Sequence, residues 1–224
     1  TSDNGPWLIK NKGYVDGNLP AHHGGSAGAL RSGKVSTWEG GIRVPTIAWA
    51  PGRIPAGEVC SSLAATIDLL PTFAKLAGAE LPDDRVIDGR DVSHLLRGED
   101  PQGDRHFLYY HLNHLQAVRQ GQWKLILPRP ENPEWLGLQA RNRHIHPRDD
   151  GAIPELFLVD LEKDIGESTN VARAHPEVVK RLLEIVDAAR RDIGDHDRVG
   201  ENVRFFDPPG ERPDKPQGTW FKRK

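Results

Sequence analysis

The chain has 224 residues, and its 30 Lys or Arg against 32 Asp or Glu give a formal net charge of −2. This near-neutral balance argues against a general nucleic-acid-binding protein, because phosphate contacts require an excess of basic residues. A hydrophobic fraction of 37% is sufficient for a buried core, and the single cysteine excludes a disulfide framework or a multi-cysteine zinc module. No apolar run approaches the roughly 20 residues that span a bilayer.

The first part of the chain predicts loops followed by a strand and helices. Residues 1–41 are rich in Gly, Asn, His and Ser and predict loops. Residues 42–50 form an apolar run that predicts a buried strand. Residues 66–77 carry apolar side chains at helical spacing, and Gly78 follows them as a helix terminator. Residues 91–96 predict a second, short helix.

The second part predicts an antiparallel sheet followed by one long helix. Short β-type segments occur at residues 107–111, 116–119, 123–127 and 156–161. The Gln-Gly-Gln turn at residues 120–122 predicts a hairpin between the second and third of them. Residues 176–193 have the clearest helical periodicity in the chain. Residues 195–224 are charged and rich in proline, and predict an irregular tail.

This order of elements predicts an α/β layer joined to a small antiparallel α+β unit. The composition changes near residues 98–106. We therefore expect one domain over residues 1–98, a second over residues 99–193 and a tail over residues 194–224.

Lys34 lies in a stretch, residues 28–35, that differs from a P-loop at one position. Val35 stands where that motif requires a hydroxyl group for magnesium, and neither a strand before it nor a helix after it is predicted. We therefore reject a nucleotide-binding loop. Lys34 remains a candidate functional residue, because a lysine on a glycine-rich loop can serve as a point charge for a tetrahedral oxyanion.

Asp3 and Asn4, followed by Gly5, allow two interpretations. The first is an Asx turn with no function beyond the local backbone. The second is part of a site for a hard cation, since a carboxylate and an amide oxygen suit calcium. Calcium takes about six to eight oxygen ligands, so the remaining ligands would come from elsewhere.

Three other features are weaker candidates. Four histidines occur in two pairs, His22 with His23 and His144 with His146. No acidic or sulfur ligand stands near them at zinc-site spacing, so solvated histidines are the favoured interpretation. Cys60 has no partner motif and predicts a small buried or semi-buried thiol. The long arginine-containing loop at residues 128–154 is predicted equally to be a substrate rim or a plain surface insertion.

Four segments, taken in chain order, resemble the signatures of type I sulfatases, the arylsulfatase family of the alkaline-phosphatase-like superfamily. Residues 2–6 resemble the family's S-D-N-G metal motif. Residues 30–45 resemble its long second signature, L-R-x-G-K-x-x-x-[WY]-E-G-G-x-R-x-P. Residues 66–78 resemble the helix that follows, and residues 156–170 resemble its end motif. The second signature is the specific part of this resemblance, which covers residues 1–193.

The resemblance implies a fold and a chemistry. The fold would be the C-terminal part of an alkaline-phosphatase-like α/β sandwich, followed by a small antiparallel sheet plus helix subdomain. Asp3 and Asn4 would be ligands of a Ca²⁺ ion, and Lys34 would be a catalytic and substrate-binding residue that contacts a sulfate oxygen. The reaction would be hydrolysis of a sulfate ester by a formylglycine nucleophile, with calcium and basic side chains stabilising charge. The substrate would be a sulfated small molecule or glycan, and the location periplasmic or secreted.

The sequence also departs from the family pattern. Cys60 is not a formylglycine precursor, because Ser62 and Ala64 stand where that motif requires Pro or Ala and then Arg. Ile-Gly at residues 165–166 replaces the usual Pro of the end motif.

The family's nucleophile normally precedes the first of these segments, so we expect a sulfatase fragment that is inactive alone. Loss of the first half of the sheet would leave apolar faces at residues 42–50 and 66–77 exposed. Two alternatives stay open: a phosphoesterase of the same superfamily, and a non-catalytic binding or assembly module that keeps the C-terminal fold.

Overall fold

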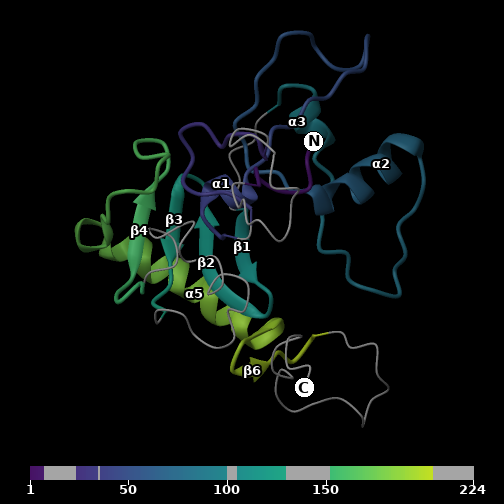
Figure 1. Ribbon diagram of the computed structural model, residues 1–224. Coiled ribbons are helices and arrows are strands. Elements are labelled where there is room, and N and C mark those ends of the chain that lie inside the picture. The colour runs from purple at the N-terminus through teal and green to yellow at the C-terminus, as the bar shows by residue number, and fades with distance from the viewer. Residues whose placement is uncertain (8–23, 35, 100–104, 130–151, 204–224) are drawn as a thin grey trace, which may run out of the picture. The chain divides into compact units, whose positions relative to one another are not determined.

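The computed structural model describes residues 1–7, 24–34, 36–99, 105–129 and 152–203 (Figure 1). The chain divides into two compact units. One comprises Thr1–Pro45 together with His106–Lys224, and the other comprises Thr46–Arg105. In the first unit, the glycine-rich segment near the N-terminus therefore clusters with the sheet of the second half of the chain.

The first unit is built on a four-stranded antiparallel sheet in the order β1-β2-β3-β4. Its strands are β1 (His106–His111), β2 (His114–Gln120), β3 (Trp123–Ile126) and β4 (Phe157–Asp160). Gly121 has a φ of +58°, a conformation that favours glycine, in the turn that joins β2 to β3. The predicted hairpin and all four predicted strands are confirmed.

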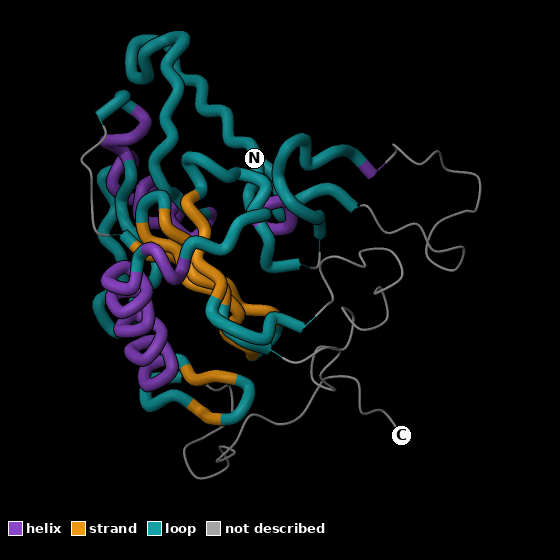
Figure 2. Tube along the Cα trace, turned by 90° about the vertical axis from the view of Figure 1, so that its left-hand side faces the viewer, coloured by secondary structure: helices purple, strands orange, loops and turns teal. Residues whose placement is uncertain are grey.

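One face of this sheet is covered by α5 (Pro176–Asp192), the predicted long helix, which Figure 2 shows on one side of the strands. Proline in the first turn and apolar side chains at helical spacing explain why the helix forms here and which side it buries. The core between the helix and the sheet consists of buried aliphatic residues: Leu115, Val118, Leu125, Leu127, Leu158, Val178, Leu182, Val186 and Ala189.

The opposite face of the sheet packs against the segment that contains Trp38. This indole is 1% exposed and meets the ring of Phe157 edge-on, with the ring centroids 6.3 Å apart. The remaining buried members of this second core are Tyr109, Ala117, Ile126, Val159 and Leu161. A short helix, α1 (Glu39–Ile42), begins directly after Trp38. The sheet is thus buried on both faces.

The C-terminal end of α5 continues into a small hairpin that the sequence does not predict. β5 (Gly194–Asp195) pairs antiparallel with β6 (Arg198–Val199). The expectation of an irregular tail from residue 195 onward is therefore wrong for residues 195–199. The strands are only two residues long, too short for a sequence pattern to reveal. A 3₁₀ turn, η4 (Ala172–Ala174), precedes α5.

The second unit contains η2 (Thr66–Asp68), α2 (Leu69–Ala77) and α3 (Ser93–Leu96). These confirm the predicted helices at residues 66–77 and 91–96, and Gly78 ends α2 with a φ of +69°. The carboxylate of Asp68 holds this unit together. It accepts bonds from the backbone N–H groups of Ala65 and Arg90 and a bidentate ion pair from Arg105 at 2.5 and 2.8 Å.

The apolar run at residues 42–50 does not form the buried strand that the sequence predicts. Ile42 ends α1, residues 46–50 belong to no strand, and the side chains of Ile47 and Trp49 are 89% and 85% exposed. A strand needs a neighbour for its backbone hydrogen bonds, and no described segment pairs with this run. The exposure agrees with the expectation that an incomplete sheet leaves this run uncovered.

The apolar side of α2 also faces solvent. Its large side chains Leu69, Leu70, Phe73 and Leu76 are all exposed, whereas Pro71 and Thr72 are buried. No helix within the described residues is long and apolar enough to cross a membrane.

Candidate functional site

Lys34 lies on a loop that is folded tightly onto itself. The backbone N–H and the hydroxyl group of Ser36 both donate to the carbonyl oxygen of Gly33, at 3.2 and 3.0 Å. The N–H of Gly40 donates to the carbonyl oxygen of Arg31 at 2.8 Å. A Cβ atom at Gly40 would lie 2.3 Å from that same oxygen, so only glycine allows this approach. The backbone of this loop therefore follows a path that requires glycine at position 40.

The amino-terminal segment is hydrogen-bonded to this loop. The N–H of Gly5 donates to the carbonyl oxygen of Gly41 at 3.0 Å, and the N–H of Lys34 donates to that of Pro6 at 2.9 Å. The ammonium group of Lys34 lies 4.9 Å from the centroid of the Trp7 ring. The structure thus brings the segment with both predicted calcium ligands beside the predicted sulfate-binding lysine.

Asp3 and Asn4 offer oxygen atoms at the surface of this segment. Asp3 is exposed, and its Oδ1 accepts a 3.4 Å hydrogen bond from the hydroxyl of Ser2. The side-chain amide of Asn4 donates from Nδ2 to the carbonyl oxygen of Gly5 at 2.8 Å. A carboxylate next to an amide oxygen suits a hard cation, but two ligands cannot complete a calcium shell. The residues present fit part of a calcium site.

A cluster of buried charges attaches the same loop to the sheet. Lys124 on β3 is fully buried, and its ammonium group donates to the carbonyl oxygen of Thr37 at 2.8 Å. The same group donates to Oε1 of Glu39 at 3.1 Å and forms a 2.7 Å ion pair with Oε1 of Glu167. One lysine therefore joins the loop, the sheet and the segment after β4.

Glu39 contacts three strands and the segment after β4. Its Oε1 accepts from the hydroxyl of Tyr109 on β1 at 2.7 Å, and its Oε2 accepts from Arg119 on β2 at 3.0 Å. The N–H of Glu39 donates to Oε2 of Glu167 at 2.7 Å. These bonds fix the first residue of α1 against the sheet.

The two carboxyl groups of this cluster titrate differently. Burial alone would raise the pKa of Glu39, but Lys124, Arg119 and the hydroxyl of Tyr109 together lower it below its ordinary value. Burial raises the pKa of Glu167, and the neighbouring Lys124 offsets this only in part. Burial and the charge of Glu39 raise the pKa of Tyr109, so its hydroxyl stays neutral and donates. Glu39 is thus the firmly ionised partner of Lys124.

Arg31 and Glu167 form the outer side of the cluster. The guanidinium of Arg31 lies 3.6 Å from the centroid of the Trp38 ring and donates to the carbonyl oxygen of Glu167 at 2.7 Å. Glu167 has a φ of +52°, in the left-handed region that non-glycine residues rarely occupy. This unusual backbone lets one residue present its carbonyl to Arg31 and its carboxylate to Lys124.

Sequence reasoning missed the functional candidates of this cluster. Glu39 and Glu167 both lie inside segments that resemble sulfatase signatures, which is the one signal that could have identified them. Lys124 carries no such signal, because a lysine in a short strand is ordinarily on a solvated face.

The remaining candidates from the sequence are Cys60, the paired histidines and the loop at residues 128–154. Cys60 is exposed, so the prediction of a buried or semi-buried thiol is wrong. Its neighbours Val59 and Ser61 are also exposed, so no core forms around it. The four paired histidines and most of the loop at residues 128–154 lie outside the described residues. Where that loop meets the described chain, Arg129 and Ile153 form an antiparallel bridge.

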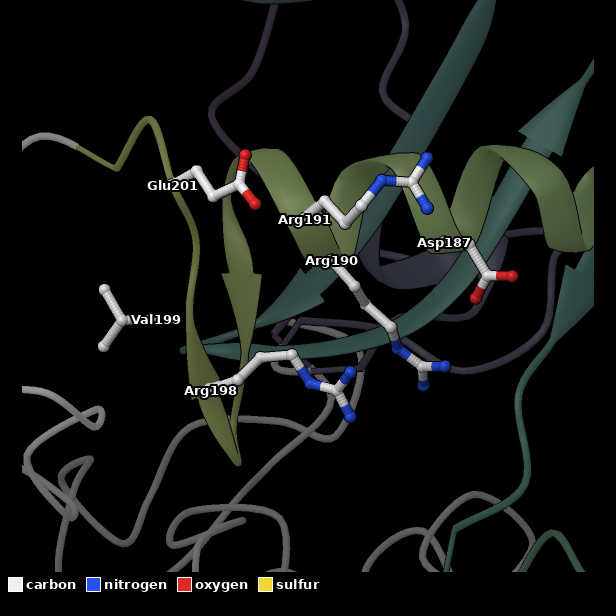
Figure 3. A pocket seen from close by; sticks show the side chains of 6 residues that line it. All are labelled: Asp187, Arg190, Arg191, Arg198, Val199 and Glu201. Carbon is white, nitrogen blue, oxygen red and sulfur yellow. The ribbon is translucent and has the colours of Figure 1, made fainter.

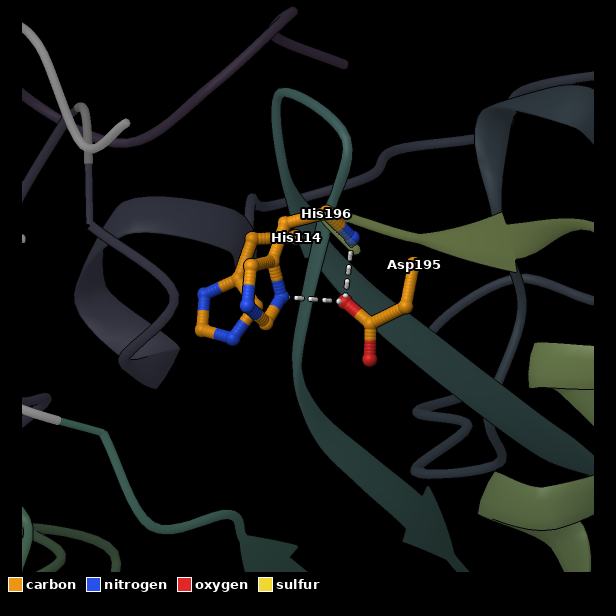
Figure 4. Close-up of side chains that lie close together, drawn as sticks. All are labelled: His114, Asp195 and His196. Carbon is orange, nitrogen blue, oxygen red and sulfur yellow. Dashed lines mark hydrogen bonds and ion pairs between the residues drawn. The ribbon is translucent and has the colours of Figure 1, made fainter. Parts of the chain in front are cut away.

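His114, Asp195 and His196 form a group with metal-ligating side chains (Figure 4). The carboxylate of Asp195 already accepts from the N–H groups of Leu115 and His196 and from Arg190. Burial alone would raise the pKa of Asp195, but these bonds lower it. Burial holds the pKa of His114 far below its ordinary value. The group is therefore a saturated anchor that fastens β5 to β2 rather than a set of free ligands.

A hollow of about 280 Å³ lies beside the end of α5 and the β5–β6 hairpin (Figure 3). Its walls carry three arginines together with Asp187, Glu201 and Val199. Arg190 is paired with Asp195, and Arg198 with Asp197, each at 2.8 Å. Since its charges are largely balanced from within, this hollow has no evident preference for an anionic ligand.

Comparisons with known proteins agree on one family. Residues 33–135 match the family described as N-sulphoglucosamine sulphohydrolase, C-terminal, and residues 102–210 match the C-terminal region of aryl-sulfatase. Steryl-sulfatase of Mus musculus is 37% identical over 177 residues, which cover 75% of this chain and 28% of the relative. Arylsulfatase G of Canis lupus familiaris is 35% identical over 223 residues, which cover 92% of this chain and 38% of the relative.

A solved structure shows the same similarity. It comes from work on the metabolism of multiple glycosaminoglycans by Bacteroides thetaiotaomicron, with 28% identity and a TM-score of 0.60. The alignment covers 84% of this chain and 37% of that one. The chain thus spans well under half the length of the proteins that it resembles.

Proposed function

Because this chain corresponds to the C-terminal region of type I sulfatases, in the arylsulfatase and steryl-sulfatase family, we propose that it contributes part of the active site of an enzyme that hydrolyses sulfate esters. The complete active site belongs to a longer protein, called the full-length enzyme below. The chain alone is inactive in this proposal, since no residue in it fits the formylglycine precursor motif.

One observation in the structure carries the proposal. The Asp3–Asn4 segment and the Lys34 loop are hydrogen-bonded to each other through Gly5 with Gly41 and through Lys34 with Pro6. A pair of oxygen ligands for a hard cation and a cationic side chain therefore occupy neighbouring segments. An anion held between a metal and an ammonium group is the arrangement that sulfate transfer requires.

We assign the residues of this chain as follows. Asp3 and Asn4 supply two oxygen ligands to calcium, which when bound stabilises negative charge on the sulfate group. Lys34 donates to a sulfate oxygen and stabilises the charge that accumulates as the ester bond breaks. Its N–H bond to Pro6 and its place over the Trp7 ring orient the side chain. The nucleophile comes from the longer protein.

The substrate class is part of the same proposal. The relatives include a steryl-sulfatase, and the structural match comes from work on glycosaminoglycan metabolism. We favour a carbohydrate sulfate, because the structural match comes from work on the metabolism of glycosaminoglycans. A periplasmic or secreted location accompanies this choice and stays a prediction.

The test is turnover by the full-length enzyme. We expect it to hydrolyse an aryl sulfate, to lose activity when calcium is chelated, and to recover when calcium is restored. The 224-residue chain serves as the inactive control. Preference for an aryl phosphate over the sulfate would favour the phosphoesterase alternative. Absence of both activities in a formylglycine-containing preparation would favour a binding module and contradict the proposal.

A further inference from the structure

The geometry points to Glu39 and Lys124 as positioning residues that hold the Lys34 loop in its active arrangement. This inference deepens the proposed function and rests on it. In this inference, both residues act through the backbone that carries Lys34. The cluster that contains them is called the buried ion cluster, and it comprises Glu39, Tyr109, Arg119, Lys124 and Glu167.

The first argument comes from the strand register. Arg119 on β2 lies directly opposite Lys124 on β3. Like charges at directly opposed positions destabilise a sheet. The carboxylate of Glu39 bridges these two cations, with Oε2 on Arg119 at 3.0 Å and Oε1 on Lys124 at 3.1 Å. The sheet thus presents one buried and one partly buried positive charge, and the loop supplies the anion that lies between them.

The second argument is that Lys124 has three oxygen partners. Its ammonium group donates to the carbonyl oxygen of Thr37 and to Oε1 of Glu39, and it forms an ion pair with Oε1 of Glu167. Two of these oxygens belong to residues 30–45, the segment that resembles the second sulfatase signature. The third belongs to Glu167, which follows β4. Two hydrogen bonds and one ion pair at a single buried group fix the position of the loop, whereas apolar packing would permit it to slide.

The third argument links the cluster to Lys34. Glu39 starts α1, and the next two residues close the loop: Gly40 donates to Arg31, and Gly41 donates to Trp38. The carbonyl of Gly41 in turn accepts from Gly5, in the segment that carries the predicted calcium ligands. Cβ atoms at Gly40 and Gly41 would lie 2.3 Å from the carbonyl oxygens of Arg31 and Ser36, so these glycines are tightly packed within the loop. We therefore expect a shift of Glu39 to move the loop with it. The positions of the Asp3–Asn4 segment and of Lys34 therefore both depend on Glu39.

The free energy of buried ion pairs distinguishes a role of this cluster in positioning the loop from a role in stabilising the fold. A buried ion pair gives little net stability, because desolvation of the charges offsets their attraction. Removing one partner leaves an unpaired buried charge, whereas replacing the charges together with neutral groups of similar size is often neutral. A variant that replaces Glu39, Lys124 and Glu167 together, the three fully buried charges of the cluster, should therefore remain folded and yet lose the bonds that place the loop.

The experiment compares the full-length enzyme with a triple variant that combines Glu39→Gln, Lys124→Met and Glu167→Gln. Arg119 keeps its charge, and its side chain is 13% exposed. Arg119 retains a carbonyl acceptor at Gly121, 2.9 Å away. We expect a thermal midpoint close to that of the wild type, and a kcat that falls by about 10²-fold, the cost of an ångström-scale misplacement. Amide exchange should accelerate at Lys34, Gly40 and Gly41, and stay unchanged in β2 and β3. The matched control removes the exposed Lys75–Asp91 ion pair by Lys75→Met with Asp91→Asn, and should change none of these.

Two single variants keep the inference testable if the triple variant does not fold. Glu39→Gln should lower kcat more than Glu167→Gln, because only Glu39 lies between the opposed cations. Equal effects of the two would overturn the inference. So would a folded triple variant with turnover within threefold of the wild type, or one that loses turnover while its loop amides keep wild-type exchange. Failure of the proposed function is a separate result, in which the wild-type enzyme itself shows no sulfatase turnover.

Discussion

The backbone N–H of Glu39 donates to Oε2 of Glu167, 2.7 Å away and 128 positions later in the chain. Two acidic residues that would ordinarily repel each other are thereby held around a single buried lysine. The bond joins the segment that carries Lys34 to the segment after β4. It explains why two sequence signatures so far apart are parts of one structural unit.

Replacing Lys34 tests the assignment of the sulfate-binding side chain. In the full-length enzyme, Lys34→Ala should lower turnover of an aryl sulfate by ~10²–10³-fold, because it removes a preorganised charge from the site. Lys34→Arg should restore little, since a planar guanidinium cannot replace a compact point charge. The exposed Lys180 provides the matched control, as Lys180→Ala. If Lys34 only tethers its loop, the melting temperature falls instead, and turnover of Lys34→Ala stays within about threefold.

Calcium binding by the 224-residue chain should be weak. Asp3 and Asn4 contribute two of the six to eight oxygen ligands that calcium takes, so the dissociation constant should be no lower than about millimolar. Calorimetric titration measures this, with Asp3→Ala as the variant that removes the charged ligand. A micromolar site that Asp3→Ala abolishes would show that the remaining ligands lie within this chain.

Acid should weaken the second unit through Asp68. Burial alone would raise the pKa of this carboxyl, but the ion pair from Arg105 and the N–H groups of Arg90 and Ala65 lower it. A group with a depressed folded pKa stabilises the fold above its unfolded value of about 3.9, and this contribution is lost as pH falls through the folded value.

The measurement for Asp68 is amide exchange in η2 and α2 between pH 5 and pH 2. Protection should decline below about pH 4 in the wild type. Arg105→Met removes the partner of a buried charge, which costs roughly 3–5 kcal/mol for a fully buried pair, so protection should be lower at pH 5 and should approach that of the wild type as Asp68 becomes protonated. Protection that is equal at pH 5 and pH 2 would contradict this role.

The exposed side of α2 should behave differently in the short and the long protein. Leu70 and Phe73 are 59% and 57% exposed, so Leu70→Asp with Phe73→Asp should leave the melting temperature of the 224-residue chain unchanged and reduce its aggregation. In the full-length enzyme, where we expect this face to be covered, the same change should destabilise by several kcal/mol, since Phe→Ala alone costs about 3–5 kcal/mol in a core. An equal effect in both proteins would refute that expectation.

Local signals predict the sheet and the long helix well. Two short β-type segments with Gly121 in the turn between them are sufficient to predict the β2–β3 hairpin, and the apolar spacing from Val178 to Ala189 is sufficient for α5. The strand predicted at residues 42–50 fails because burial there depends on a neighbouring strand that no described residue supplies. The burial of Lys124 also escapes prediction, because its acceptors come from segments far away in sequence.

In the candidate site, too, local sequence predicts some features and not those that depend on distant segments. Asp3, Asn4 and Lys34 could be proposed from residue type and resemblance, and their segments do lie side by side. Their assignment to calcium and sulfate stays a prediction. The sequence gives no hint that the loop is fixed by charges on the far strands, because each of those charges is unremarkable in its own local context.

The left-handed backbone at Glu167 limits how this family member can change over time. Glycine is the residue that a φ of +52° favours, and such a substitution would relieve the local conformation. It would also delete the carboxylate that meets Lys124 and the N–H of Glu39. The backbone conformation at position 167 therefore favours glycine, whereas the contacts of its carboxylate require glutamate. A change to glycine would relieve the backbone and remove those contacts. With glycine at position 167, Lys124 would keep Glu39 as its one remaining carboxylate partner among the described residues.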